Sequence, residues 1–239
     1  MTIIWRNTMH KLAIALRSSA LAAVVLLAAC AETGPKTEAY GVSFDGLEQV
    51  TGTGFADVYK KPGVQLGEYD TFALAPCEVA FRKNWLRDQN SSRLDLTSRV
   101  TQKDVDRIKG QLSEMCTGTF REELEKAPPY KLVDEFPEGE QVLVLAPAII
   151  NLDINAPDVM SAGRSRSYTT QSGEMTLYLE LKDGATGDTL ARIVDRRKDF
   201  DDMRLQWTNS VSNRADAQLI LNRWAKYLRD GLDEVQAGK

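Results

Sequence analysis

A strict alternation of apolar and polar side chains between residues 175 and 182 constrains the fold of this chain more than any other feature. One face carries Met175, Leu177, Leu179 and Leu181, and the other carries Thr176, Tyr178, Glu180 and Lys182. The turn sequence Asp-Gly-Ala-Thr-Gly-Asp follows at 183–188, and Thr189–Arg197 returns. This segment predicts an antiparallel β-hairpin, whose apolar face must be buried against other elements.

Two segments carry apolar residues at helical spacing and predict the elements that cover such a face. The first helix begins at Thr101, with Asp104 placed as in a capping box, and stops before Pro128 and Pro129. Its apolar stripe is Val105, Ile108, Leu112, Met115, Cys116, Phe120 and Leu124. The second helix runs from Asn213 to about Val235, with Trp224 on its apolar stripe.

Shorter apolar runs predict further strands. They lie at Tyr69–Val79, where Pro76 marks the end, at Tyr130–Asp134, and at Val142–Ile154, with a bend or bulge at Pro147. The Gly-rich residues 44–68 predict irregular structure on the surface, and residues 155–172 predict a polar loop. We therefore expect an α+β fold: a mixed β-sheet of about five strands with two main amphipathic helices packed on it.

The N-terminus predicts export and lipidation. Arg6, Lys11 and Arg17 precede an apolar run that ends in Leu27-Ala28-Ala29-Cys30, a lipobox. A membrane-spanning helix needs about 20 apolar residues, and this run is shorter. We expect residues 1–29 to be a lipoprotein signal peptide, whether translation starts at Met1 or at Met9. An ordinary cleaved signal with a chance cysteine is the alternative.

The same region predicts the location of the mature protein. Several acyl chains on Cys30 give a stable membrane anchor, whereas a single chain holds only marginally. Residue 31 is Ala rather than the Asp that retains lipoproteins in the inner membrane, so we expect the outer membrane and a periplasm-facing domain. Residues 30–43 are expected to form a flexible tether, and 44–239 a single periplasmic α+β domain.

Charge and composition exclude several classes of function. The net charge of the whole chain is −4, and removing the three cations of the signal leaves about −7, which argues against nucleic-acid or anionic-lipid binding as the main role. The single histidine, His10, lies in the signal, so the mature chain has no histidine for a catalytic triad or a metal site. No nucleotide-binding or nucleophile motif is present. We expect no catalytic residues, no metal and no cofactor.

The three cysteines divide into one for lipid and two for each other. With Cys30 acylated, Cys77 and Cys116 remain, and an even pair in an oxidising compartment predicts a disulfide. It would join the end of a strand to the apolar face of the first helix. Two buried free thiols are the alternative.

Three groups of residues are candidate binding sites. Asp199-Phe200-Asp201-Asp202 indicates either a cation site or, more simply, a solvated loop, since EF-hand spacing is absent. Trp85 and Trp207, predicted in loops, are candidates for partner contacts, whereas Trp224 is expected in the core. A set of cations forms either a basic patch or a solvated strand face that nearby aspartates offset: Arg164, Arg166, Arg192, Arg196, Arg197 and Lys198.

Several motifs resemble a known family. The stretches Ser161-Ala-Gly-Arg, Ser172-Gly-Glu-Met-Thr-Leu, the hairpin from Leu181 to Arg192 and Asp195-Arg-Arg are similar to the bacterial lipoproteins grouped as a domain of unknown function, DUF3313. Weaker similarity at Tyr69-Asp-Thr-Phe-Ala-Leu-Ala-Pro and Asn222-Arg-Trp-Ala extends it over about residues 44–235. The resemblance implies no activity and no catalytic residues. Cys77 stands where the family pattern implies a small apolar residue, which would make the disulfide particular to this branch.

These observations predict a membrane-anchored lipoprotein with a non-catalytic domain that binds or organises envelope components. The expected partners are the membrane, through the lipid, and an envelope protein or complex; nucleic acid is not expected. Two alternatives remain open. One is an auxiliary lipoprotein of an envelope transport system, and the other is a cell-wall hydrolase that works with two carboxylates across a cleft. The sequence does not give the oligomeric state.

Overall fold

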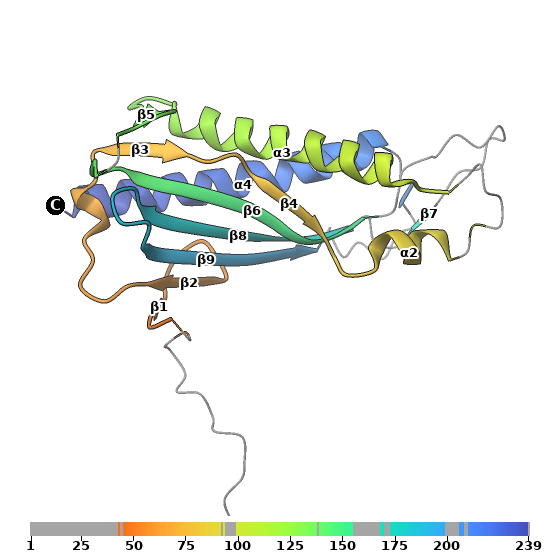
Figure 1. Cartoon of the computed structure of the whole chain (residues 1–239), viewed down its shortest axis with the longest axis horizontal. Helices are drawn as coiled ribbons and strands as arrows, with labels where there is room; N and C mark the ends of the chain where they lie inside the picture. Colours follow the sequence, from red (N-terminus) through yellow and green to blue (C-terminus); the bar gives the residue numbers. More distant parts are fainter. Residues whose placement is uncertain are drawn as a thin grey trace, which may run out of the picture. The chain divides into compact units, whose positions relative to one another are not determined.

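The computed structural model describes residues 43, 45–91, 93, 99–137, 139–154, 168–169, 173–198, 206–207 and 210–238, which all belong to one compact unit, Gly41–Lys239. Its fold is α+β, as predicted (Figure 1). Two long helices, α3 (Gln102–Leu124) and α4 (Ser210–Ala237), cover one face of a mixed sheet. The prediction of about five strands was too low. The sheet has eight, and β7 (Tyr168–Thr169) and β10 (Gln206–Trp207) pair separately.

The eight strands form a sheet that is antiparallel in one half and parallel in the other. The order β1-β2-β9-β8-β6 is antiparallel throughout, whereas β3 and β4 both lie parallel to β6 and β5 lies parallel to β3. The strands are β1 (Glu48–Val50), β2 (Asp57–Lys60), β3 (Thr71–Leu74), β4 (Glu78–Phe81), β5 (Lys131–Val133), β6 (Leu143–Ile154), β8 (Gly173–Asp183) and β9 (Thr189–Lys198).

The hairpin of β8 and β9 confirms the pattern that predicted it. Leu179 pairs with Ile193, and the leucines of β8 lie on the face that the helices cover. The Asp183 carboxylate accepts hydrogen bonds from the N–H groups of Ala185 and Thr186 at 2.7 and 3.0 Å, which closes the turn. Gly187 has a φ of 76°, a conformation that favours glycine.

Strand β6 runs through Pro147 without a break, so the predicted bulge there was wrong. The Leu145 carbonyl accepts a hydrogen bond from the Ala75 N–H beyond the end of β3. Backbone groups two residues apart face the same side of a strand. Pro147, which lacks an N–H, therefore faces the gap between β3 and β4, where no donor is needed. The irregularity lies further along, between Ile150 and Asp153, where Asn151 has a φ of 52°.

The strand predicted at Tyr69–Val79 ends before Pro76, the residue expected to mark its end, and a second strand follows the proline. β3 and β4 both use β6 as a neighbour, with Leu74 opposite Leu145 and Glu78 opposite Ala148. Ala75, Pro76 and Cys77 form the connection between them. Pro76 ends the pairing of β3 with β6, and β4 then pairs with β6 further along that strand.

Both long helices begin close to the predicted positions. The Thr101 hydroxyl accepts from the Asp104 N–H at 3.3 Å, and the Asp104 carboxylate accepts from the Thr101 N–H at 3.0 Å, so the capping box is confirmed. α3 ends at Leu124, before the prolines, and α4 starts three residues before Asn213. Phe120, Leu221 and Trp224 are fully buried against the sheet, and each stabilises the fold by about 1.5–3 kcal/mol.

The Gly-rich residues 44–68 are more ordered than predicted. They hold β1, β2 and the short 3-10 helix η1 (Leu66–Glu68). The connection between β1 and β2 packs on α4. There the Phe55 and Tyr227 rings lie edge to face, with their centroids 5.6 Å apart. Gly54 lies so close to Tyr227 that a Cβ there would be 2.8 Å from the ring. The glycine therefore permits this close approach. In the sequence, the same glycine only indicated irregular structure.

Candidate functional site

Several predicted site residues lie outside the described residues. Cys30 with the rest of the predicted signal and tether, the Asp199–Asp202 segment, and Arg164 and Arg166 belong to this group. Trp207 is described only through its backbone in β10. The remaining predicted residues are in the described part of the chain, and they separate into three places.

The disulfide between Cys77 and Cys116 is confirmed, and it ties the β3–β4 connection to α3. Both cysteines are buried, with Cα atoms 6.0 Å apart. Two hydrogen bonds reinforce the link: the Cys77 N–H donates to the Thr117 hydroxyl at 2.9 Å, and the Ser113 hydroxyl donates to the Cys77 carbonyl at 2.6 Å. The disulfide and these two hydrogen bonds together hold the β3–β4 connection against α3, so the role of the disulfide is structural.

Trp85 was predicted in a loop, and that prediction was wrong. It is the first residue of the short helix α2 (Trp85–Asn90), and its side chain is 1% exposed, so it presents no surface to a partner. Its indole N–H donates to the Ile154 carbonyl at 2.8 Å at the end of β6, and its ring stacks on Phe81. Trp224 is in the core, as predicted, and its indole N–H donates to the buried Asp195 carboxylate at 2.9 Å.

The predicted set of cations does not form one patch, because Arg192 stands apart. Arg192 is 8% exposed on the sheet face opposite the helices, where it forms ion pairs with Asp45 and with Glu180 at 3.5 Å. Its guanidinium also lies over the Tyr178 ring at 5.6 Å. The hydrogen bond from Arg192 lowers the pKa of Asp45 to about 2. Arg192 thus fixes the start of the described domain to β9.

The other cations, Arg196, Arg197 and Lys198, are the last residues of β9, at the same end of the sheet as the ends of β4 and β6 that contact α2. α2 is held in place by an apolar cluster and by two hydrogen bonds. Trp85 joins Val100 and Val105 in a small separate apolar cluster. The Asn90 side chain donates to the Val100 carbonyl at 2.9 Å and accepts from the Val100 N–H at 2.8 Å. The start of α3 and the ends of β4 and β6 therefore converge on α2.

A row of ion pairs crosses the strand ends at this place. Arg82 bridges Asp88 and Asp153, each at 2.7 Å, and Glu174 binds Arg196 at 2.5 Å and Lys198 at 3.9 Å. Asp153 and Glu174 are opposite each other on β6 and β8. Hydrogen bonds from Arg82 lower the pKa of Asp88, and hydrogen bonds from Arg196 lower the pKa of Glu174. Asp88 and Glu174 are therefore stabilised as anions by neighbouring guanidinium groups.

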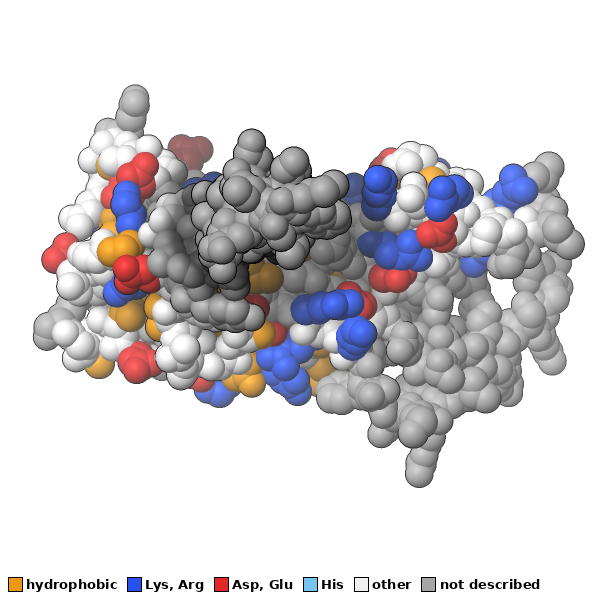
Figure 2. Space-filling model, turned by 90° about the horizontal axis from the view of Figure 1, so that it is seen from below, with side chains coloured by type: hydrophobic (Ala, Val, Ile, Leu, Met, Phe, Trp, Pro, Cys, Tyr) orange, Lys and Arg blue, Asp and Glu red, His pale blue; other side chains and the backbone are white. Residues whose placement is uncertain are grey.

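Cations nevertheless outnumber carboxylates here, and Figure 2 shows Lys and Arg side chains gathered over the end of the molecule that carries α2 in Figure 1. We call this region the basic end. It holds eleven cations, Arg82, Lys83, Arg87, Arg93, Arg99, Lys103, Arg107, Lys109, Arg196, Arg197 and Lys198, against six carboxylates, Asp88, Asp104, Asp106, Asp153, Glu174 and Asp195. Of these cations, only Arg196, Arg197 and Lys198 belong to the set singled out from the sequence, so the basic end as a whole was not predicted.

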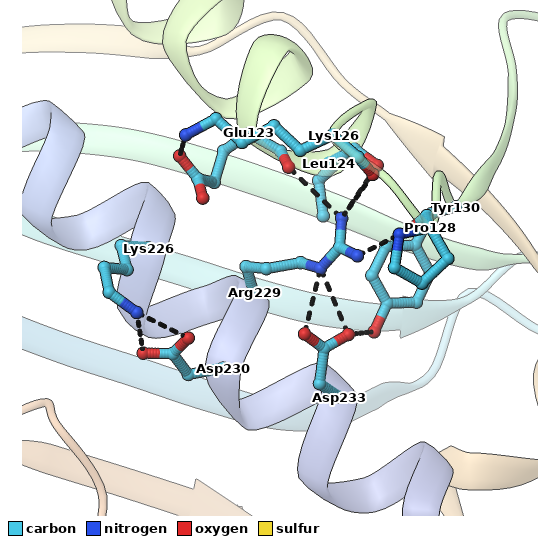
Figure 3. A network of polar contacts seen from close by, with 9 residues as sticks. All are labelled: Glu123, Leu124, Lys126, Pro128, Tyr130, Lys226, Arg229, Asp230 and Asp233. Atoms are coloured by element: carbon cyan, nitrogen blue, oxygen red, sulfur yellow. Dashed lines mark hydrogen bonds and ion pairs between the residues drawn. The ribbon is translucent and has the colours of Figure 1, made fainter.

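A second polar network joins the ends of the two long helices (Figure 3). The Arg229 guanidinium, from α4, donates to the carbonyls of Glu123, Leu124 and Lys126 at 3.2 Å and to that of Pro128 at 2.5 Å. It also pairs with Asp233 and lies over the Tyr130 ring at 4.6 Å. The last carbonyls of a helix have no partners within the helix, and here one buried side chain donates to two of them and to two carbonyls of the segment that follows.

Among the described residues, no group of three or more His, Cys, Asp or Glu is placed to hold a metal ion. Over the same ranges, no helix has both the length and the apolar character needed to cross a membrane. What the basic end does offer is a rigid set of guanidinium and ammonium groups, which suits the recognition of anions.

A family model described as "Protein of unknown function (DUF3313)" matches residues 36–228. No curated protein matches the chain. Two similar solved structures are PelC dodecamers from Paraburkholderia phytofirmans. One, a single-residue variant, is 12% identical with a TM-score of 0.30, covering 70% of this chain and 94% of that one. The other is 10% identical with a TM-score of 0.29, covering 74% and 96%. Likeness at these TM-scores is too weak to transfer any property.

Proposed function

The chain belongs to the DUF3313 family, which brings no known activity with it, and we propose that this member is a lipoprotein anchored through Cys30 whose domain binds an envelope component without catalysis. The family assignment agrees with the resemblance seen in the hairpin motif. The matched region begins at residue 36, inside the predicted tether, and stops at 228, within α4.

The roles of the three cysteines are the main support for the proposed lipid anchor. Cys77 and Cys116 are joined in the structure, so Cys30 is the one cysteine of the sequence left for another role. It follows small residues in Leu27-Ala28-Ala29-Cys30, the pattern that signal peptidase and acyl transfer require. A buried structural disulfide is also typical of proteins that fold outside the reducing cytoplasm. The lipobox and the disulfide therefore support the same compartment.

The state of the carboxyl groups supports a non-catalytic domain. A cell-wall hydrolase needs one carboxyl group with a raised pKa as general acid and a second group across a cleft. At the basic end Asp88 and Asp153 share the Arg82 guanidinium, and the pKa of Asp88 is lowered rather than raised. The pKa of Glu174 is lowered as well. These groups favour ion pairing over proton donation at neutral pH.

Fatty-acid labelling of the full chain in cells tests the anchor. We expect the wild type to incorporate an alkyne-labelled fatty acid and to sediment with membranes. Cys30→Ser should lose the label, whereas the Cys77→Ser/Cys116→Ser double variant should keep it. Labelling that persists in Cys30→Ser, or a wild-type chain that carries no acyl group, would overturn the proposal.

The residue after the lipidated cysteine tests the proposed location. Ala31 favours the outer membrane, so Ala31→Asp should move the protein to the inner-membrane fraction on a density gradient, and Ala31→Ser should leave it in place. An identical distribution of all three proteins would contradict sorting by this residue. Cross-linking of intact envelopes, followed by purification of the full chain, then tests whether the domain has a macromolecular partner.

A further inference from the structure

The charges of the described domain are strongly separated. The basic end carries an excess of five positive charges, eleven against six. The remaining described residues carry eleven cations and twenty carboxylates, an excess of nine negative charges. The net charge of the chain conceals this asymmetry. A molecule with such a distribution turns its positive end toward an anionic surface and keeps the rest of its surface away.

The cations of the basic end are carried on a rigid support. Trp85 and Asn90 fix α2 to the end of β6 and to Val100, and the capping box fixes the first turn of α3. Arg196 and Lys198 extend from β9 beside Glu174. Side chains held on short, separate elements present charge over a broad area. This arrangement suits an extended anionic surface.

The start of the domain limits how far the basic end can lie from the predicted anchor. Twelve residues, 31–42, separate Cys30 from Ser43, and a chain of that length spans at most about 45 Å. Asp45, two residues after Ser43, is fixed to Arg192 on β9. Lys198 is six residues further along that strand, about 20 Å away. The bilayer surface is therefore within reach of the basic end at all times, at high effective concentration.

From these three observations we propose that the basic end docks on the anionic phospholipid headgroups of the membrane that holds Cys30. This inference rests on the proposed anchor. Arginine, which contributes seven of the eleven cations, binds phosphate through two parallel hydrogen bonds. A basic surface adds to a lipid anchor as a second signal for membrane attachment. Docking would hold the domain against the bilayer in one orientation, with the acidic part of its surface facing away.

Neighbouring stretches of sequence do not cancel this charge. Residues 92–98, 155–172 and 199–209, outside Arg93 and the two short strands, contain five acidic residues and three basic ones. Even if all of them lay at the basic end, an excess of three positive charges would remain. The net negative charge of the whole chain argues against anionic-lipid binding as its main role. It does not argue against a local, auxiliary contact between the basic end and anionic lipid.

Site-specific photo-cross-linking of the full lipidated chain tests the proposal. A photoreactive amino acid replaces Ser91, which is exposed beside α2, or Leu219, which is 57% exposed on α4. Each protein is inserted into nanodiscs of phosphatidylcholine, with or without phosphatidylglycerol. We expect lipid adducts at position 91 to exceed those at 219 by about tenfold in the anionic nanodiscs. The excess should vanish with phosphatidylcholine alone and at high salt.

A matched pair of charge reversals completes the test. Arg87→Glu with Lys103→Glu should reduce adducts at position 91 by about tenfold, while Arg223→Glu with Lys226→Glu on α4, the same change in net charge, should not. Equal adducts at both positions, or no effect of lipid charge, would overturn the proposal. Adducts with an acidic protein in whole envelopes, in place of lipid, would overturn it too. The mass of the N-terminal peptide reports acylation of Cys30 separately, so failure of the anchor is distinguishable.

Discussion

The Arg229 side chain is 6% exposed, and its guanidinium satisfies four carbonyl groups at the end of α3 as well as the Asp233 carboxylate. Arg229→Met would remove the side-chain donor of the Lys126 and Pro128 carbonyls, whereas the Glu123 and Leu124 carbonyls keep a backbone N–H and Asp233 keeps the Tyr130 hydroxyl. We expect the free energy of unfolding to fall by about 2–3 kcal/mol, measured by urea denaturation. Arg229→Lys should recover only part of the loss, because an ammonium group cannot reach all of these acceptors.

Lys226 is the matched control on the same helix. Its ion pair with Asp230 is exposed, with side chains 63% and 55% accessible. Lys226→Met should therefore cost about 0–0.5 kcal/mol. Similar losses in Lys226→Met and Arg229→Met would show that burial of the guanidinium has no special importance for the joint between the helices.

Gly54 and Gly110 provide a second contrast at the residue scale. A Cβ at Gly54 would lie 2.8 Å from the Tyr227 ring, whereas a Cβ at Gly110, in α3, would meet nothing within 4 Å. Gly54→Ala should destabilise the domain by about 1–3 kcal/mol, because the ring must move. Gly110→Ala should stabilise it by about 0.5–1 kcal/mol through helix propensity. Thermal denaturation of both variants checks the signs, and equal signs would contradict the packing described here.

At the scale of elements, the disulfide joins the β3–β4 connection to α3 across 39 residues of sequence. Replacing both Cys77 and Cys116 by Ala should lower the free energy of unfolding by about 3–4 kcal/mol in the loop-entropy description. The fold should persist, because Ser113 and Thr117 still bind the backbone of the connection. Urea denaturation measures the loss, and far-ultraviolet circular dichroism checks the secondary structure. An unchanged midpoint, or a chain without secondary structure, would contradict this.

Elements with a local signal were predicted well from the sequence. Alternation identified β8 and β9, and the capping box with its apolar stripe identified α3 to within a residue at its start. Elements that depend on distant partners were missed. β2 is short and Gly-flanked, and it is a strand because it pairs with β9. α2 lacks a capping side chain and is stabilised by Trp85 against Ile154, a contact across 69 residues.

The candidate site follows the same rule. Residues 82–109 contain eight Lys and Arg against four Asp, an excess that the sequence displays openly. Their meeting with Arg196 and Lys198 depends on the order of β4, β6, β8 and β9 in the sheet, which no local pattern specifies. The same topology removed Arg192 from the predicted patch, because its position on β9 faces Asp45 and Glu180 instead.

At the scale of the whole molecule, ion pairs make the fold sensitive to acid. Hydrogen bonds from Arg192 lower the pKa of Asp45 to about 2, and those from Thr101 lower the pKa of Asp104 to about 2. The pKa values of Asp88 and Glu174 are lowered too, first by Arg82 and Arg196 respectively. A carboxyl group with a lowered pKa in the folded state stabilises the fold above its ordinary pKa, and this contribution is lost as the pH falls toward the folded value.

We therefore expect stability to be constant from neutral pH to about pH 5 and to decrease by several degrees in thermal midpoint as the pH falls from about 4.5 toward 2. Thermal denaturation across this range measures it. Asp45→Asn combined with Asp104→Asn should lower the midpoint at neutral pH and flatten the acid-dependent decrease, because two of the titrating groups are gone. Asp134→Asn is the control, since Asp134 pairs with Arg121 through a side chain that is 81% exposed. A midpoint that rises on acidification, or a decrease of unchanged steepness in the double variant, would show that these ion pairs do not control the acid stability of the domain.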